Sequence, residues 1–353
     1  MRDNKDHSRG ARLLIVTASL VIVIAGIRAA DTIVIPFLLS ILIAIVCINP
    51  LFWLQRRGVP TIIAVILVVV SIMAVSVMLT IFVGTSLKNF SRSLPAYQKS
   101  LHGETTALRE WLQKRNINIS EQILQEYFDP GIAMQMVANM LSGLGAMLTN
   151  TFLILLTVIF ILLEASGFPD KLRAAIGNPT ASLSDFSAFI ESVHHYLVLK
   201  TVVSIFTGIS ITIGLLMLKI DYPLLWGLVA FLLNYVPNIG SIFAAVPAVL
   251  LAIIQFGAGT AFLVALEYAA VNIFFGNFVE PRLMGERLGL STLVVFLSLV
   301  FWGWVLGPVG MLLSVPLTMI LKIALESNED TRWIAILLGS SSYRKIQKAL
   351  EEK

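Results

Sequence analysis

Apolar stretches long enough to cross a lipid bilayer recur along this chain of 353 residues. A membrane-spanning helix needs about 20 mostly apolar residues, and runs of that length alternate here with short polar segments. The pattern predicts an all-α fold: a polytopic membrane protein built as a helix bundle. The predicted uninterrupted spans are residues 13–30, 32–52, 60–84, 144–164, 198–218 and 259–279.

Two further apolar stretches, 224–256 and 290–322, are interrupted near their middles by proline and glycine. Each half has about 13–17 residues, or roughly 20–25 Å of helix, which is shorter than the ~30 Å hydrocarbon core. We therefore expect each stretch to form a re-entrant helical hairpin, giving six full passes; the alternative is that both cross fully, giving eight. Paired Pro/Gly-broken segments point to the binding region of a transporter.

Both breaks leave backbone N–H and C=O groups without their helical partners. Such groups cannot face lipid, so they must be buried in protein or line a wet cavity. With one hairpin entering from each side of the membrane, the breaks form an inverted pair that meets near the midplane. We expect the break residues to approach each other or to line one cavity. These residues are Pro237, Asn238, Gly240, Gly307, Pro308 and Gly310.

The polar parts of the chain suggest four regions. Residues 1–85 form N-terminal membrane helices, 86–145 a small amphipathic helical insert, 146–325 the transmembrane transport core and 326–353 a basic tail. In the insert, apolar residues recur at helical spacing among many charges. Basic residues gather at the N-terminus, around Arg56 and in the tail, which predicts cytoplasmic N- and C-termini.

Composition supports a membrane protein and argues against several other classes. The chain is 57% hydrophobic and 13% charged, whereas soluble domains average about 25% charged residues. The net charge of +4 fits basic cytoplasmic loops, so no nucleic-acid partner is expected. The single cysteine, Cys47, cannot form an internal disulfide or a CxxC motif.

No enzyme signature is present in the sequence. There is no GxxxxGK[ST] phosphate loop, no HExxH and no GxSxG. His194 and His195 are adjacent, and neighbouring residues on a helix diverge by about 100°, so the two cannot share a metal-binding face. We predict that the protein is not an enzyme and has no catalytic residue, metal site or cofactor.

Polar residues inside the apolar segments are the candidates for a substrate or ion pathway, because such residues are costly in a membrane. They surround the first break and continue into the next span. In one interpretation these residues form a polar wall that binds a small polar solute or a monovalent cation. In the alternative, the asparagines join helices by hydrogen bonds and Gly276 lets two helices approach closely. The set is Asn234, Tyr235, Asn238, Glu267, Asn272, Gly276, Asn277 and Glu280; Asn272, Gly276 and Glu280 are spaced by four.

Charged and aromatic residues near the span ends have simpler interpretations. Glu267 lies at mid-span and is a candidate proton carrier, the alternative being a carboxyl that is paired with a base or faces water. We expect Lys200 to extend its ammonium toward the membrane surface and Glu280 to lie at the interface. Trp302 and Trp304 fit an aromatic belt.

Several motifs together resemble the autoinducer-2 exporter family. They are FLLNYVPNIGS at 231–241, NFVEPRLMG at 277–285, LGLS at 288–291, FWGWVLGPVGMLLSVPL at 301–317 and HHYLVLKT at 194–201. The resemblance covers nearly the whole chain and is most specific after residue 190. It supplies no ligand residues to carry over.

The resemblance implies a homo-oligomeric protein of the bacterial inner membrane, surrounded by lipid, that exports the quorum-sensing signal autoinducer-2 by secondary transport. Autoinducer-2 is a small sugar derivative with many hydroxyls, which uncharged Asn and Tyr side chains suit. The family also includes members that resemble Na⁺(Li⁺)/H⁺ antiporters, for which Glu267 or Glu280 would be the ion carrier. A third alternative is a non-transporting membrane scaffold.

Overall fold

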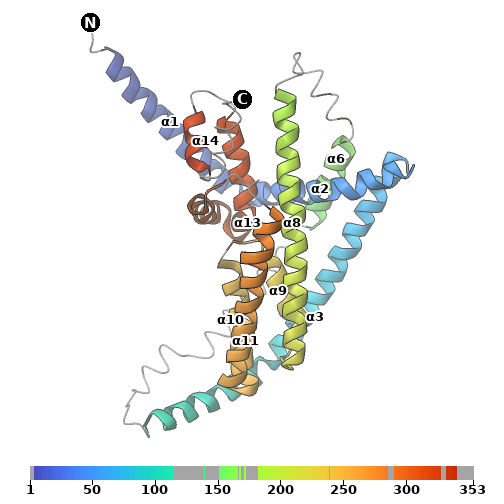
Figure 1. The fold of residues 1–353 in the computed structure, drawn as a ribbon, viewed down its shortest axis with the longest axis vertical. Helices are drawn as coiled ribbons and strands as arrows, with labels where there is room; N and C mark the ends of the chain where they lie inside the picture. The colour runs from blue at the N-terminus through green and yellow to red at the C-terminus, as the bar shows by residue number, and fades with distance from the viewer. Residues whose placement is uncertain are drawn as a thin grey trace. The chain divides into compact units, whose positions relative to one another are not determined.

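The computed structural model describes residues 4–113, 139, 151–165, 167, 171, 182–237, 239–284, 290–326 and 331–339 (Figure 1). Within these residues the chain is helical, and its one β feature is an isolated bridge between Leu290 and Gly339. The all-α prediction is therefore confirmed for the part of the chain that is described.

The helices follow the predicted order of apolar segments closely. They are α1 (Asn4–Ala29), α2 (Asp31–Arg56), α3 (Thr61–Gln113), α6 (Thr151–Ala165), α8 (Ser182–Met217), α9 (Pro223–Leu233), α10 (Ile239–Phe256), α11 (Ala258–Asn272), the π-helix η1 (Ile273–Val279), α12 (Glu280–Met284), α13 (Thr292–Glu326) and α14 (Arg332–Leu338).

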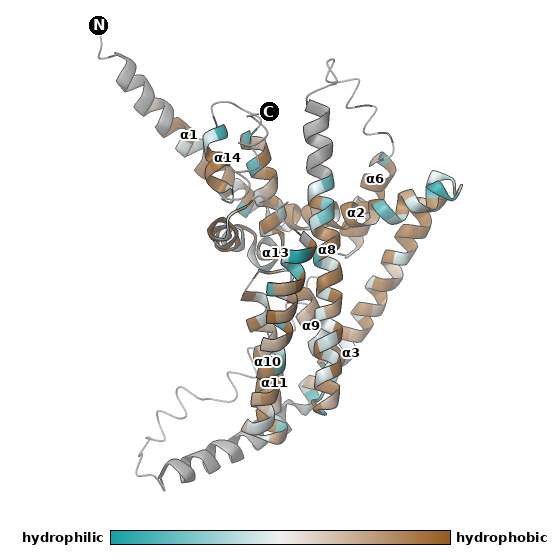
Figure 2. Ribbon diagram, in the orientation of Figure 1, coloured by the Kyte–Doolittle hydropathy of each residue, from teal (hydrophilic) through white to brown (hydrophobic). Residues whose placement is uncertain are grey.

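Among the residues that the structure describes, six helical stretches are long and apolar enough to cross a membrane, and most of their length is hydrophobic in Figure 2. Shorter apolar helices cover Leu14–Ala29, Thr151–Ala165 and Pro223–Leu233. These findings confirm a multi-pass membrane protein. The six stretches are Asp31–Arg56, Thr61–Tyr97, Glu191–Met217, Ile239–Phe256, Ala258–Leu283 and Thr292–Glu326.

The helix α3 differs from the sequence prediction, because it does not end near residue 84. It continues without interruption past Pro95 to Gln113. A fall in hydropathy marks where a chain leaves an apolar environment, and it does not by itself end a helix. Most of the rest of the predicted insert lies outside the described residues, and the four-region division stays a prediction.

The chain forms two compact units, residues 1–44 with 290–353, and residues 45–289. In the second unit, α8, α9, α10 and α11 lie side by side (Figure 1). Their shared core contains the fully buried side chains of Trp226, Leu215 and Leu251, and Phe90 of α3 packs edge-on against Trp226.

The first broken segment folds back on itself. The backbone N–H of Asp221, just before α9, donates to Oε1 of Gln255 at the end of α10, over 3.1 Å. The two ends of the segment therefore meet, so α9 and α10 form a helical hairpin. How deeply its tip lies in the membrane, and hence the choice between six and eight passes, stays a prediction.

Gly240 makes the reversal at the tip of this hairpin sterically feasible. A Cβ placed on Gly240 would overlap the carbonyl oxygen of Leu233 and lie 3.1 Å from the Cβ of Val236. The turn also keeps its N–H groups bonded: Asn234 donates to the carbonyl of Ala230 at 3.0 Å, and Val236 to that of Leu233 at 2.9 Å. The break is thus a closed turn and not a frayed helix.

The second broken segment, in the other unit, also reverses direction. Gly307 has φ 64° and ψ −150°, a left-handed conformation that favours glycine. Trp302 Nε1 donates to Thr318 Oγ1 over 3.1 Å, although 16 residues of straight helix would span about 24 Å. The two halves of α13 are therefore folded together. Gly310 fits here because an added Cβ would overlap the carbonyl oxygen of Trp302.

The tryptophans before this break have protein partners beyond a simple aromatic belt. Trp302 is half-buried and bonded to Thr318, whereas Trp304 is exposed and lies under the Arg28 guanidinium, 4.8 Å from the ring centroid. The predicted meeting of the two breaks concerns residues in different units, and it stays a prediction.

We expect Gly240→Ala to lower the free energy of unfolding by about 1–3 kcal/mol, because the new methyl group must displace the backbone of Leu233. Thermal unfolding of the detergent-solubilised protein measures the effect. Gly84→Ala is the matched control, since a Cβ there meets no atom within 4 Å among the described residues. Equal unfolding midpoints for the two variants would contradict the close contact at the tip.

Candidate functional site

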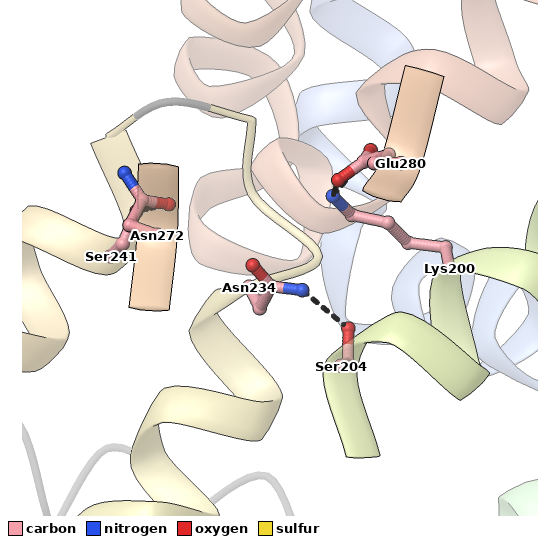
Figure 3. Close-up of polar contacts among 6 residues, drawn as sticks. All are labelled: Lys200, Ser204, Asn234, Ser241, Asn272 and Glu280. Carbon is pink, nitrogen blue, oxygen red and sulfur yellow. Dashed lines mark hydrogen bonds and ion pairs between the residues drawn. The ribbon is translucent and has the colours of Figure 1, made fainter. Parts of the chain in front are cut away.

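One face of α8 holds the first break in place through uncharged side chains. Asn234 Nδ2 donates to Ser204 Oγ over 2.9 Å (Figure 3). The Tyr235 hydroxyl donates to Thr201 Oγ1 over 2.7 Å. Ser204 is completely buried. Two of the predicted pathway residues, Asn234 and Tyr235, therefore converge on α8.

A third polar contact lies on the other side of the break. Ser241 is in the first turn of α10, and its hydroxyl donates to Oδ1 of Asn272 at the end of α11 over 2.8 Å. Figure 3 shows this pair across the turn from Asn234 and Ser204. Together these side chains form what we call the break cluster: Thr201, Ser204, Asn234, Tyr235, Ser241 and Asn272.

A buried ion pair borders the break cluster. Lys200 Nζ lies 2.8 Å from both carboxylate oxygens of Glu280, which is the first residue of α12 (Figure 3). The side chains are only 5% and 21% exposed, so water screens the pair weakly. The prediction that Lys200 reaches for the membrane surface is wrong, because its ammonium turns inward to a partner 80 residues away.

The helix that carries Asn272 and Glu280 is not a regular α-helix between them. Residues Ile273–Val279 form a π-helix, and the N–H of Glu280 donates to the carbonyl of Phe275, five residues earlier. Because a π-helix has more residues per turn than an α-helix, the spacing of four between Asn272, Gly276 and Glu280 does not place them on one face. Asn272 contacts α10 and Glu280 contacts α8.

Gly276 and Asn277 do not join helices within the described structure. Only Oδ1 of Asn272, in the same helical segment, comes within 4 Å of a Cβ built on Gly276, at 3.6 Å. Asn277 is exposed. The alternative of a close helix approach at Gly276 is therefore wrong for the described residues, because no atom of another helix lies within 4 Å of that Cβ position.

Glu267 lies apart from the break cluster, against α8. A Cβ added to Gly214 would collide with the Glu267 carboxyl group, so the carboxyl rests directly on the α8 backbone. Both carboxylate oxygens are buried, and neither has a hydrogen-bond partner among the residues described. The alternative to a proton carrier, a carboxyl that is paired with a base or faces water, is therefore wrong among the described residues.

The other predicted site residues are distributed as follows. The carbonyl of Pro237 accepts a hydrogen bond from Ile239 in the tip of the first hairpin, while Asn238 lies outside the described residues. Gly307, Pro308 and Gly310 form the tip of the second hairpin, in the other unit. In the described portion of the chain, no three His, Cys, Asp or Glu side chains are grouped to hold a metal ion.

Sequence analysis missed four contributors: Lys200, Thr201, Ser204 and Ser241. A spacing signal was available for the first three, since Ser204 lies four residues after Lys200 and three after Thr201, which are the separations that place side chains on neighbouring positions of a helix surface. Ser241 had no such signal, because its role depends on the turn that brings α10 against α11.

Removing one partner of the buried ion pair should be strongly destabilising. We expect Lys200→Met to lower the free energy of unfolding by about 3–5 kcal/mol, because it leaves the Glu280 carboxylate without its cation. The double variant Lys200→Met/Glu280→Leu should recover most of that loss, because it removes the carboxylate as well. Lys171→Met is the control: the Lys171–Glu164 pair is 69% and 54% exposed, and such pairs contribute about 0–1 kcal/mol. Thermal unfolding that ranks the two single variants equally would contradict this assignment.

Comparison with known proteins finds a family of transport proteins along most of the chain. The model of the AI-2E family transporter matches residues 17–329. The chain is 44% identical to the AI-2 transport protein TqsA of Escherichia coli (strain K12) over 331 residues, which covers 94% of this chain and 96% of the relative. It is 42% identical to a putative transport protein of Haemophilus influenzae, covering 93% and 96% of the two chains, and 39% identical to the putative transport protein YhhT of E. coli (strain K12), covering 96% and 97%.

The match spans both hairpins, the break cluster and the membrane helices that precede them. The earlier resemblance is thereby confirmed. This multi-pass membrane protein belongs to the AI-2E transporter family.

Proposed function

We propose that this transporter exports autoinducer-2 across the bacterial inner membrane by secondary transport. The E. coli relative that is 44% identical over 94% of this chain is named an AI-2 transport protein. We also propose that the N- and C-termini are cytoplasmic, as the basic residues favour, and that the protein assembles as a homo-oligomer.

The observation that carries the proposal is the chemistry of the break cluster. Its three contacts, Asn234–Ser204, Tyr235–Thr201 and Ser241–Asn272, all join uncharged side chains. Hydroxyl and amide groups both donate and accept hydrogen bonds, so they match a solute with many hydroxyls. The cluster lies at a helix break, where transporters commonly bind their substrates.

These contacts also suggest how a solute enters without leaving buried polar groups unpaired. When a hydroxyl of the solute inserts between Asn234 and Ser204, each side chain exchanges one partner for another. The net change for each exchanged hydrogen bond is then small, because the desolvation of the protein groups has already occurred on folding. Without solute, the Thr201 and Ser204 hydroxyls of α8 make the hydrogen bonds that solute hydroxyls make when the solute is bound.

The proposed pathway includes further residues beside the break cluster. Pro237 and Gly240 lie in its turn, Glu280 borders it through Lys200, and Gly276 and Asn277 lie on the π-helix. We also include Asn238, which lies outside the described residues. We include the tip of the second hairpin, Gly307, Pro308 and Gly310, as the inverted counterpart.

A second candidate function is Na⁺(Li⁺)/H⁺ antiport, and one observation favours it. Glu267 is a carboxyl inside a predicted span whose oxygens are buried without a hydrogen-bond partner in the described structure. An antiporter needs such an ionisable group within the membrane. The two functions differ in the transported species. Measuring autoinducer-2 release and sodium uptake with the same purified protein therefore distinguishes them.

Purified protein in liposomes loaded with autoinducer-2 should release it faster than protein-free liposomes, and it should take up little sodium when a pH gradient is imposed. Sodium uptake without autoinducer-2 release would establish the antiporter instead. Release at the protein-free rate, with correctly folded protein, would contradict export.

The break cluster makes a more specific prediction. Asn234→Ala should reduce the initial rate of autoinducer-2 release about 3- to 10-fold, the equivalent of about one hydrogen bond of 0.5–1.5 kcal/mol. Thr80→Ala is the control, because the Thr80 hydroxyl bonds only to the carbonyl of Ser76 within an exposed part of α3. If both variants release autoinducer-2 at the same rate, the break cluster is not the binding region.

A further inference from the structure

The carboxyl of Glu267 has no role in the break cluster, yet it occupies a site shaped for it. Its residue lies in α11, well inside the predicted span Ala258–Leu283. Gly214 of α8 provides a notch, since any side chain at that position would collide with the carboxyl. A glycine facing a carboxyl across two packed helices allows the acid to reach the neighbouring backbone.

The described helices that pack against Glu267 offer it no cation. The facing part of α8, residues 201–217, has no charged residue, and neither α9, α10 nor η1 has one. Lys200 is 14 residues from Gly214, about 21 Å along the helix, and is paired with Glu280. Lys219 and Asp221 are exposed in the loop after α8, where Asp221 accepts a hydrogen bond from Tyr97.

The one titratable neighbour of Glu267 along α11 is Tyr268. Its hydroxyl is also buried without a hydrogen-bond partner in the described structure. A charged carboxylate in such surroundings would cost several kcal/mol, because neither water nor a base compensates for its lost solvation. The conformation described here therefore suits the neutral acid, and a conformation that accommodates the anion must open this contact to water.

We propose that Glu267, seated in the Gly214 notch, is a proton-binding site that couples export to proton movement through the membrane. The proposal rests on the proposed function and assigns the ion that drives it. A carboxyl that is stable only as the acid in one state and only as the anion in another exchanges one proton in each conformational cycle.

The exchange balances as follows. On the side of the membrane with more protons, the hydrated carboxylate takes a proton from water and an O–H bond forms on one carboxylate oxygen. The neutral acid then packs into the Gly214 notch as the conformation changes. On the opposite side the O–H bond breaks, the proton returns to water, and the carboxylate is restored. One proton moves inward for each uncharged solute molecule that moves outward.

This stoichiometry gives a quantitative expectation. One pH unit across the membrane and a tenfold solute ratio both correspond to about 1.4 kcal/mol, so each pH unit should support about a tenfold gradient of solute. Because each cycle moves one net charge, the membrane potential must be held at zero with potassium and a potassium ionophore. Under that condition, liposomes containing the whole protein, with equal autoinducer-2 on both sides and an imposed difference of one pH unit, should approach that ratio. Counterflow of labelled autoinducer-2 without any pH difference reports transport itself.

In Glu267→Gln, which cannot bind and release the proton, we expect the pH difference to drive no accumulation while counterflow remains detectable. Glu164→Gln is the control and should accumulate solute like the natural protein, since Glu164 is exposed and paired with Lys171. Gly214→Ala should reduce the accumulated ratio, whereas Gly259→Ala should not, because a Cβ at Gly259 meets no atom within 4 Å among the described residues.

The outcomes separate this inference from the proposed function. Counterflow in the natural protein without pH-driven accumulation would overturn the proton site and leave autoinducer-2 export standing, and so would accumulation driven only by a sodium gradient. Tenfold accumulation by Glu267→Gln would also overturn it. Loss of counterflow together with accumulation in a folded Glu267→Gln would assign the residue to solute binding and overturn the coupling role. Absence of both activities in the natural protein would overturn the proposed function and this inference with it.

Discussion

Broken helices in an apolar environment must satisfy the backbone groups that the break releases, because lipid offers no hydrogen bonds. In the first hairpin, N–H groups of the turn bond to the carbonyls of Ala230 and Leu233 within the turn itself. Gly240 permits this by letting the chain pass against the Leu233 carbonyl. The second hairpin uses the same device, with Gly310 against the carbonyl of Trp302. The placement of the polar side chains around each tip depends on these tight turns.

A tight turn brings polar residues from distant parts of the sequence together. Asn234 and Tyr235 reach α8 because α9 packs against α8, and Ser241 reaches Asn272 because α10 packs against α11. The Lys200–Glu280 pair then ties α8 to α12, immediately after the π-helix. π-Helical turns occur often at functional sites. The result is a buried polar region inside an apolar bundle, bounded by one ion pair and flanked by one carboxyl without a partner in the described structure.

The sequence predicted the apolar spans and the positions of both breaks well, because membrane length and Pro/Gly interruption are local signals. It could not predict the partner of Lys200, since the pairing joins residues 80 positions apart and depends on the packing of α8 against α12. The prediction that Asn272, Gly276 and Glu280 share one helical face was wrong for a related reason. That prediction requires 3.6 residues per turn, whereas the chain forms a wider π-helix over Ile273–Val279. The unpartnered state of Glu267 depends on a notch at Gly214 that sequence spacing alone does not reveal.

If the break cluster binds autoinducer-2, Asn234 must become accessible to solute during transport, and the chain's single cysteine makes a direct test simple. In a Cys47→Ser background, the account predicts that Asn234→Cys reacts with a charged, membrane-impermeant thiol reagent and that autoinducer-2 slows the reaction. Val70→Cys, at an exposed apolar position of α3, should not react, because lipid covers that face. An Asn234→Cys thiol that stays unlabelled, or one whose labelling rate autoinducer-2 does not change, would contradict the account.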